Sequence, residues 1–368
     1  MNPLQALNQH GQSVWLDAIS RSLIQSGELQ RLIDEDGLTG VTSNPTIFAK
    51  AIADSTAYDD SLLRVLRLNF MVANPVLAER LMLEDIQMAA EVLQPVYHRT
   101  DGADGFVSLE VSPDVAHDTA ATVAQARHLW FEVARPNVMI KVPATPESLP
   151  AIEMLIAQGI NVNITLMFSL EHYDAVAHAY LRGLAGHADP RRVSSVASVF
   201  VSRLDAVADR QLEAIGSTEA LALRGMTAIA NAQRIYQRFT EIFHGAAFAD
   251  LARRGARVQR PLWASTGTKN PSYSDVLYLE ALIGRDTVTT VPPATLDAFR
   301  DHGQVRASLD GTARHAEATL AAAARLGVDV HALTEQLQID GIDAFAASFE
   351  QLLATVAHKR QALAAVAP

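Results

Sequence analysis

The stretch Pro-Asn-Val-Met-Ile-Lys-Val-Pro-Ala-Thr at residues 136–145 places one lysine, Lys141, inside a short apolar run. The apolar residues around it, bounded by Asn137 and Pro143, predict a strand of about six residues. An ammonium group in a buried strand costs free energy unless it is paired or deprotonated. Lys141 is therefore either an edge-strand residue that points to water or an amine held in an apolar site as a nucleophile.

Further apolar and β-branched runs alternate with helical segments along the chain. With the lysine strand, the runs are residues 13–17, 38–44, 105–111, 138–142, 160–168, 194–201, 260–265 and 287–291. Eight strands, each followed by helix, predict an α/β fold of the (β/α)₈ or TIM-barrel class. The alternative, an open doubly wound sheet, has a glycine-rich turn after its first strand. Residues 18–21 contain no glycine, so the barrel is favoured.

The chain of 368 residues has no break in composition and no linker rich in proline, glycine or serine. We therefore predict a single domain over residues 1–368. Two segments exceed what a barrel needs: residues 46–104 predict a helical insertion, and residues 295–365 predict additional C-terminal helices.

Composition restricts the classes of partner. A hydrophobic fraction of 49% predicts a sizeable core, and a formal net charge of −11 argues against nucleic acid or an anionic membrane as the partner. There is no cysteine, and the twelve histidines form no His-x-x-x-His pair around a glutamate, so we predict no metal site. No signal peptide or membrane-spanning run is found, and we expect a cytoplasmic protein.

Polar residues recur in or just after the predicted strands, where functional groups of barrels gather. They are Asp17, Asn44, Glu110, Lys141, Asn163, Thr165, Ser198, Arg203, Ser265 and Lys269. Residues two apart share one face of a strand, so Asn163 and Thr165 are expected to face the barrel interior. Polar groups in a barrel interior must satisfy one another, and such an arrangement is usual where chemistry is done.

These residue types predict Schiff-base chemistry. A lysine beside an apolar lining loses proton affinity, and its free amine attacks a carbonyl. Glu110 would carry protons directly or through a water held by Thr165. Asp17 would take the proton of a substrate hydroxyl during carbon–carbon cleavage.

The remaining residues suit substrate binding. Asn44 and Asn163 would bind sugar hydroxyls, while Ser198, Arg203 and Lys269, with Ser265 beside them, lie where barrels often hold a phosphate. Three residues have plain alternatives. Asp17 would also serve as a helix cap, Arg203 would pair with Asp205 on the surface, and Lys269 would be an ordinary loop lysine.

Six stretches resemble transaldolases of the longer bacterial type. They are residues 15–17, 40–48, 107–113, 135–145, 159–169 and 198–203, and they follow the family's order along nearly the whole chain. The most specific motifs are Thr-Ser-Asn-Pro at 42–45, Ile-Lys-Val-Pro-Ala-Thr at 140–145 and Asn-Ile-Thr-Leu at 163–166. Two departures are evident. The family's usual glycine is missing from residues 145–152, which we expect to border the site, and Lys269 stands in place of an arginine that shorter members carry.

The resemblance implies transfer of a dihydroxyacetone unit from sedoheptulose 7-phosphate to glyceraldehyde 3-phosphate. The products would be erythrose 4-phosphate and fructose 6-phosphate, in the non-oxidative pentose phosphate pathway. The resemblance implies that Lys141 is the Schiff-base lysine and Asp17 the acid/base, and that Glu110 with Thr165 holds a water. It places sugar hydroxyls on Asn44 and Asn163, and phosphate on Ser198 and Arg203.

The same resemblance implies no cofactor, because the iminium accepts the electrons. The expected partners are small sugar phosphates, with the chain acting as a monomer or homodimer. Two other functions stay open at this point: a fructose 6-phosphate aldolase on the same scaffold, and a catalytically silent barrel that binds sugar phosphates.

Overall fold

The strands form a closed barrel in the computed structural model, which describes residues 2–69 and 71–366. The eight strands of this part of the chain are parallel and follow one another in sequence order, with the last pairing to the first. They are β1 (Gln12–Leu16), β2 (Gly40–Val41), β3 (Phe106–Glu110), β4 (Val138–Pro143), β5 (Val162–Met167), β6 (Ser195–Phe200), β7 (Arg260–Ala264) and β8 (Thr287–Val291). The predicted barrel is confirmed, and the open-sheet alternative is wrong.

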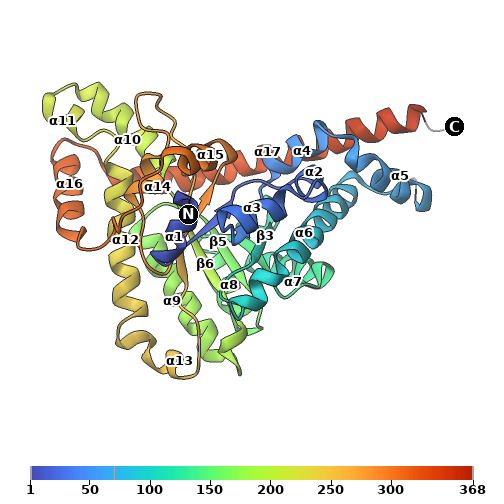
Figure 1. Cartoon of the computed structure of the whole chain (residues 1–368), viewed down its shortest axis with the longest axis horizontal. Helices are drawn as coiled ribbons and strands as arrows, with labels where there is room; N and C mark the ends of the chain where they lie inside the picture. Colours follow the sequence, from blue (N-terminus) through green and yellow to red (C-terminus); the bar gives the residue numbers. More distant parts are fainter. Residues whose placement is uncertain (1, 70, 367–368) are drawn as a thin grey trace.

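Helices follow the strands and form the outer layer (Figure 1). The α-helices are α1 (Pro3–Gln9), α2 (Arg21–Gln25), α3 (Glu28–Asp36), α4 (Pro45–Ala53), α5 (Asp59–Leu68), α6 (Asn74–Arg99), α7 (Thr119–Val133), α8 (Ser148–Ala157), α9 (Leu170–Gly186), α10 (Ser202–Ile215), α11 (Thr218–Ala222), α12 (Thr227–Phe243), α13 (Ala249–Arg253), α14 (Leu277–Ala281), α15 (Pro293–His302), α16 (Ala313–Arg325) and α17 (Val330–Val366). Short 3₁₀ turns are η1 (Thr56–Tyr58), η2 (Pro113–Val115), η3 (Pro190–Arg192) and η4 (Ala246–Phe248).

Capping side chains start several helices soon after a strand ends. The Ser20 hydroxyl accepts a hydrogen bond from the Leu23 N–H at 3.0 Å at the start of α2. Ser169 does the same for α9, with its hydroxyl 3.0 Å from the His172 nitrogen. Such caps satisfy N–H groups that have no partner within the helix. The strand-to-helix turns therefore stay compact, and they converge on one end of the barrel.

The barrel interior contains an apolar layer. Its side chains are Trp15, Phe106, Met139, Val196, Leu262, Ala264 and Val288. The Trp15 indole occupies the space beside Gly40, where an added Cβ would lie 2.5 Å from the ring. Only glycine fits that position of β2 without displacing the indole.

Polar side chains follow the apolar layer toward the C-terminal ends of the strands. Because side chains alternate along a strand, the residue two positions after each apolar one faces the same interior. Met139 is thus followed by Lys141, Val196 by Ser198 and Val288 by Thr290. The apolar layer stabilises the lower barrel, and the functional groups gather above it.

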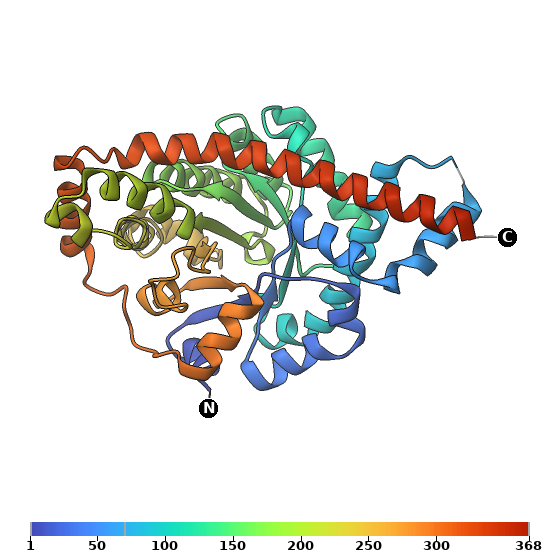
Figure 2. The same cartoon turned by 90° about the horizontal axis from the view of Figure 1, so that it is seen from above.

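Two helical segments extend beyond the barrel. Helices α4 to α6 lie between β2 and β3, where the sequence predicts a helical insertion. After β8 come α15, α16 and α17, and α17 alone has 37 residues. Figures 1 and 2 show α17 as one long red helix that crosses the molecule from α16 to α4 and α5. It joins the C-terminal end of the chain to the insertion.

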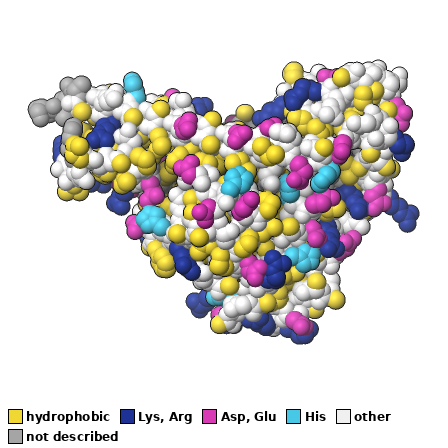
Figure 3. Space-filling model, turned by 180° about the vertical axis from the view of Figure 1, so that it is seen from behind, with side chains coloured by type: hydrophobic (Ala, Val, Ile, Leu, Met, Phe, Trp, Pro, Cys, Tyr) yellow, Lys and Arg dark blue, Asp and Glu magenta, His cyan; other side chains and the backbone are white. Residues whose placement is uncertain are grey.

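The single-domain organisation over residues 1–368 stays a prediction. Four residues of this range, Met1, Phe70, Ala367 and Pro368, lie outside the described residues. None of the helices in the described part of the chain combines the length and the apolar character needed to cross a membrane. Figure 3 shows acidic and basic side chains mixed over one face of the molecule.

Candidate functional site

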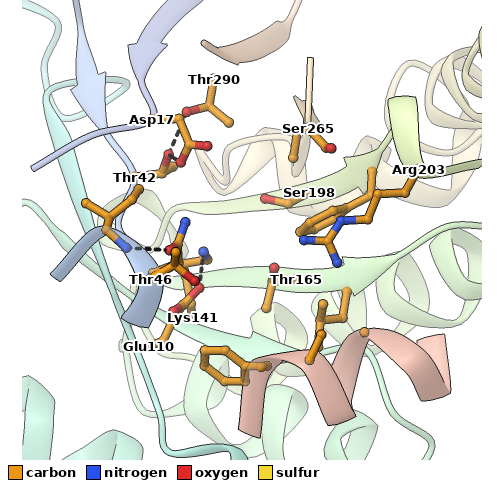
Figure 4. Close-up of a pocket in the computed structure, with 18 of the residues that line it drawn as sticks. Asp17, Thr42, Thr46, Glu110, Lys141, Thr165, Ser198, Arg203, Ser265 and Thr290 are labelled. Carbon is orange, nitrogen blue, oxygen red and sulfur yellow. Dashed lines mark hydrogen bonds and ion pairs between the residues drawn. The ribbon is translucent and has the colours of Figure 1, made fainter. Parts of the chain in front are cut away.

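A pocket of about 340 Å³ opens at the C-terminal end of the barrel. Nine of the ten predicted site residues line it: Asp17, Asn44, Glu110, Lys141, Thr165, Ser198, Arg203, Ser265 and Lys269. Figure 4 shows most of these side chains arranged around one hollow. The tenth predicted residue, Asn163, is not in the lining.

Lys141 lies inside the barrel and is only 7% exposed. Its ammonium donates a hydrogen bond to the Ser43 carbonyl at 2.9 Å and forms an ion pair with Glu110. Strand register causes this pairing, since Glu110 of β3 stands opposite Lys141 of β4. The alternative of an edge-strand lysine that points to water is therefore wrong.

Glu110 is the buried partner of the lysine. Burial raises the pKa of its carboxyl, and the attraction of Lys141 opposes that shift. A carboxylate with a raised pKa accepts a proton more readily near neutral pH than an ordinary glutamate does. Its second oxygen has no hydrogen-bond partner among the described residues and retains the capacity to accept one.

Thr165 and Asn163 lie on the same face of β5 but at different depths. Thr165 reaches the pocket lining. Asn163 is fully buried; its amide donates to the Ser108 hydroxyl at 2.9 Å and its carbonyl accepts from the Ser198 hydroxyl at 2.6 Å. Asn163 therefore contacts the pocket lining through Ser198, and it links β5 to β3 and to β6 beneath the floor.

Asp17 follows β1 and is oriented by two threonines. The Thr42 hydroxyl lies 2.8 Å from one Asp17 carboxylate oxygen and 2.6 Å from the Thr290 hydroxyl. Asp17 caps no helix, because Ser20 caps α2, so the helix-cap alternative is wrong. The sequence analysis missed Thr42 and Thr290, although both stand at strand ends in the way that identified the other residues.

Asn44 has a structural bond as well as a place in the pocket. Its side-chain oxygen accepts from the Ile47 N–H at 2.9 Å and caps α4, in which Pro45 is the first residue. Proline is well suited to that position because its missing N–H would have no helical partner. The Asn44 amide N–H groups have no hydrogen-bond partner among the described residues, and they are available to a ligand in the pocket.

Two cations occupy the opposite side of the pocket. The Arg203 guanidinium stacks over the Phe200 ring at 5.0 Å and has no carboxylate partner among the described residues. Asp205 does not pair with it and instead accepts from the Ala228 N–H at 2.7 Å, so the surface-pair alternative is wrong. Lys269 also lines the pocket and forms no ion pair within the described chain. Together the cations favour an anionic group at this end.

Ser265 begins the loop that carries Lys269. Its φ of +56° is in the left-handed region, which is uncommon for serine. Its hydroxyl lies 2.9 Å from that of Ser202, and its carbonyl accepts from the Ser202 N–H at 3.1 Å. These two contacts fix the start of the loop against α10.

The same loop is anchored again further along. The Tyr273 hydroxyl donates to Asp209 of α10 at 2.6 Å, and the Gly225 N–H donates to the other oxygen of that carboxylate at 2.9 Å. One helical turn before Asp209 lies Asp205, which is 1% exposed. Burial, with the nearby Asp209 charge, raises the pKa of Asp205 to about 7.

We expect Asp205→Asn to change how stability depends on pH. Because the pKa of Asp205 is higher in the folded chain than in the unfolded one, protonated Asp205 increases the free energy of unfolding. This increase is fully present below pH 4. It is lost as the pH rises toward 7, by about 4 kcal/mol. Asparagine has no proton to lose. Thermal unfolding at about pH 5 and about pH 8 should show the melting temperature of the variant rising relative to wild type at the higher pH.

Burying the asparagine amide of the variant also costs free energy. This cost does not depend on pH, so it cancels when the difference between variant and wild type is compared at the two pH values. Parallel melting curves for the two proteins across the pH range would contradict the raised pKa of Asp205.

Helix α17 closes one side of the pocket, which the sequence analysis did not anticipate. Gly341, Ala344, Phe345 and Ser348 line the pocket at helical spacing. The Thr46 hydroxyl donates to the Ser348 hydroxyl at 3.0 Å, linking α17 to α4. Phe345 was missed because it lies on a helix that begins well after the last strand, β8, and a helix carries no strand pattern that would place it near the site.

The segment after the lysine strand does not border the pocket, contrary to the prediction. Thr145 and Ser148 are buried, and both hydroxyls donate to the Ala116 carbonyl. The missing glycine therefore affects the junction of β4 with α8. Within the described residues, no group of three or more His, Cys, Asp or Glu side chains is arranged to hold a metal ion.

Comparisons with known proteins agree with this geometry. Residues 14–356 match the family described as transaldolase/fructose-6-phosphate aldolase. The chain is 49% identical over 360 residues to a transaldolase of Thiobacillus denitrificans, covering 97% of this chain and 100% of the relative. It is 50% identical over 364 residues to a transaldolase of Thermobifida fusca, covering 97% and 98% of the two chains. A transaldolase of Mycobacterium marinum is 45% identical over 371 residues, covering 99% of each.

Proposed function

Because the chain belongs to the transaldolase/fructose-6-phosphate aldolase family, we propose that it is a transaldolase of the pentose phosphate pathway. It would move a dihydroxyacetone unit from sedoheptulose 7-phosphate to glyceraldehyde 3-phosphate. The single observation that carries the chemistry is the buried Lys141–Glu110 pair on the floor of a pocket with two cations at its far side. The enzyme would act in the cytoplasm, as a single-domain chain that is a monomer or homodimer.

The first step forms the Schiff base. Glu110 takes a proton from the Lys141 ammonium, and its raised pKa makes this transfer less costly than it would be for an exposed carboxylate. The free amine adds to the ketose carbonyl and gives a carbinolamine. Loss of the hydroxyl as water, with a proton returned from Glu110 through a water beside Thr165, leaves the iminium.

The second step breaks the carbon–carbon bond. Asp17 takes the proton of the hydroxyl on the carbon that leaves as the aldehyde. The electron pair of the broken bond moves into the iminium and gives an enamine on Lys141. The acceptor aldehyde then enters, the enamine carbon adds to it, and Asp17 returns the proton. The hydrogen bond from Thr42 keeps the Asp17 carboxylate directed at this hydroxyl.

Substrate binding divides between the two sides of the pocket. The Asn44 amide and the Ser198 hydroxyl would bind sugar hydroxyls, with Asn163 holding Ser198 from below. Arg203 and Lys269 would bind the phosphate, with Ser265 beside them. Stacking on Phe200 fixes the plane of the Arg203 guanidinium before substrate arrives.

We expect Arg203→Ala to raise the KM for fructose 6-phosphate by about 10- to 100-fold, because a charge-assisted contact to phosphate is lost. The rate of Schiff-base formation at saturating substrate should change much less. Steady-state kinetics combined with single-turnover borohydride trapping separates the two quantities. Arg306→Ala, a change outside the pocket lining, is the control. Equal losses in both quantities would contradict a role confined to phosphate binding.

The function is tested with purified protein, fructose 6-phosphate and erythrose 4-phosphate. We expect sedoheptulose 7-phosphate and glyceraldehyde 3-phosphate to form, and little dihydroxyacetone to be released when no acceptor is present. Free dihydroxyacetone as the main product would favour the aldolase alternative instead. An absence of any turnover would favour the sugar-phosphate-binding barrel.

A further inference from the structure

Gln338 of α17 forms a bridge between two strand ends of the candidate site. Its side-chain nitrogen donates to the Ala144 carbonyl and to the Leu166 carbonyl, both at 3.1 Å. Ala144 directly follows β4, and Leu166 is the residue after Thr165 in β5. Gln338 is itself only 7% exposed. The buried Gln338 amide therefore donates both of its N–H groups to the ends of the strands that carry Lys141 and Thr165.

The bridge lies where the regular strand pairing ends. The last hydrogen bond of this ladder runs from the Ala144 N–H to the Thr165 carbonyl at 2.8 Å. Beyond it, the register of β5 against β6 shifts between Ile164 and Met167, and Leu166 has a φ of +56°. A leucine in the left-handed region costs about 1–3 kcal/mol and persists only where its surroundings hold it.

Helix α17 holds this irregular end of β5 at further points. A Cβ added to Gly341 would lie 3.2 Å from the Leu166 side chain, so the helix backbone packs closely on that residue. Glu335, one turn before Gln338, pairs with His172 at 2.8 Å, and the His172 ring accepts from the Phe168 N–H at 3.4 Å. The segment from Leu166 to His172 is thus fixed from the side of α17.

We infer that Gln338 is a positioning residue for Schiff-base chemistry, acting by holding Thr165 at its distance from Lys141 and Glu110. This inference rests on the proposed function. Without the bridge, the two carbonyls lose their donors and Leu166 relaxes from its strained conformation. Thr165 then moves with its neighbour, and a proton-transfer site misplaced by about 1 Å loses rate by up to about 100-fold. Arg203 in α10 and Lys269 in the loop after β7 keep their positions.

The test compares Gln338→Met with Gln336→Met. Methionine keeps the length of glutamine and removes both donors. Gln336 lies on the exposed face of the same helix, and among the described residues its side chain bonds only to Asp340. Single-turnover borohydride trapping with fructose 6-phosphate measures Schiff-base formation. A polyol phosphate without a carbonyl measures binding alone. For Gln338→Met we expect trapping about 10- to 100-fold slower with polyol affinity within about twofold. Gln336→Met should match wild type in both.

Gly341→Ala is a second variant in case Gln338→Met folds poorly, since alanine favours the helix while pressing on Leu166. It should also slow trapping more than it weakens polyol binding. Hydrogen exchange of the Ala144 amide, expected to be faster in Gln338→Met, reports the bridge without any reaction. Faster exchange with unchanged trapping, or equal losses of trapping and polyol binding, would overturn the positioning role and leave the proposed function intact. Wild-type protein that traps no adduct would overturn the proposed function itself.

Discussion

Lys141→Arg should abolish turnover, with a loss of about 10⁴- to 10⁶-fold, the size expected when a covalent nucleophile is removed. Arginine keeps a cation beside Glu110, so the buried carboxylate is not left unpaired. Its guanidinium stays protonated and cannot add to a carbonyl. The variant therefore separates the nucleophile from the ion pair. Activity is measured in the coupled transaldolase assay, and the adduct by mass spectrometry after borohydride reduction.

Lys50→Arg, on the exposed end of α4, is the matched control and should keep full activity. Wild-type protein should show the mass of a reduced dihydroxyacetone unit on the peptide that contains Lys141. Lys141→Met gives a second variant without the bulk of arginine. Residual activity above about 1% of wild type in either variant, or an adduct on another lysine, would contradict the role of Lys141.

Strand pattern alone was enough to predict the barrel and most of the pocket. Side chains alternate between the two faces of a strand with a period of two, and parallel strands in a closed barrel bring their C-terminal ends together. Glu110 and Lys141, separated by a helix in the chain, could therefore be predicted as neighbours. The register of β3 against β4 then explains their direct ion pair.

The depth of each side chain could not be predicted in the same way. Asn163 and Thr165 have the same strand face, yet Asn163 is sealed beneath Ser198 while Thr165 reaches the pocket. Depth depends on strand stagger around the barrel and on the irregular end of β5. Both arise from contacts between distant segments.

The position of α17 at the pocket could not be predicted from the sequence pattern either. Its residues Phe345 and Ser348 reach the pocket only because a 37-residue helix passes across the barrel to the insertion. Lys359 near its far end bonds to the Ile52 carbonyl at 3.0 Å and pairs with Asp59 at 3.1 Å. Such long-range contacts leave no local sequence signal, although the apolar positions of the helix did predict its existence.

Glu110→Gln should slow Schiff-base formation by about 10²- to 10⁴-fold, the range for loss of one acid/base group. Glutamine has nearly the shape of glutamate and keeps an oxygen for the Lys141 ammonium, but it cannot take the proton. Polyol phosphate affinity should change little, because Arg203 and Lys269 stand on the other side of the pocket. Glu241→Gln, on the exposed face of α12, is the control and should react like wild type.

The pH dependence makes the same prediction sharper. Burial raises the pKa of Glu110, so the ionised form that takes the lysine proton becomes populated only at a higher pH than for an ordinary glutamate. In wild-type protein, kcat/KM should rise with pH through that raised pKa. Glu110→Gln should lose this rise while keeping any dependence due to other groups. If the acid limb of the variant matched that of wild type, Glu110 would not be the group that accepts the proton, and Asp17 would be the next carboxylate to test.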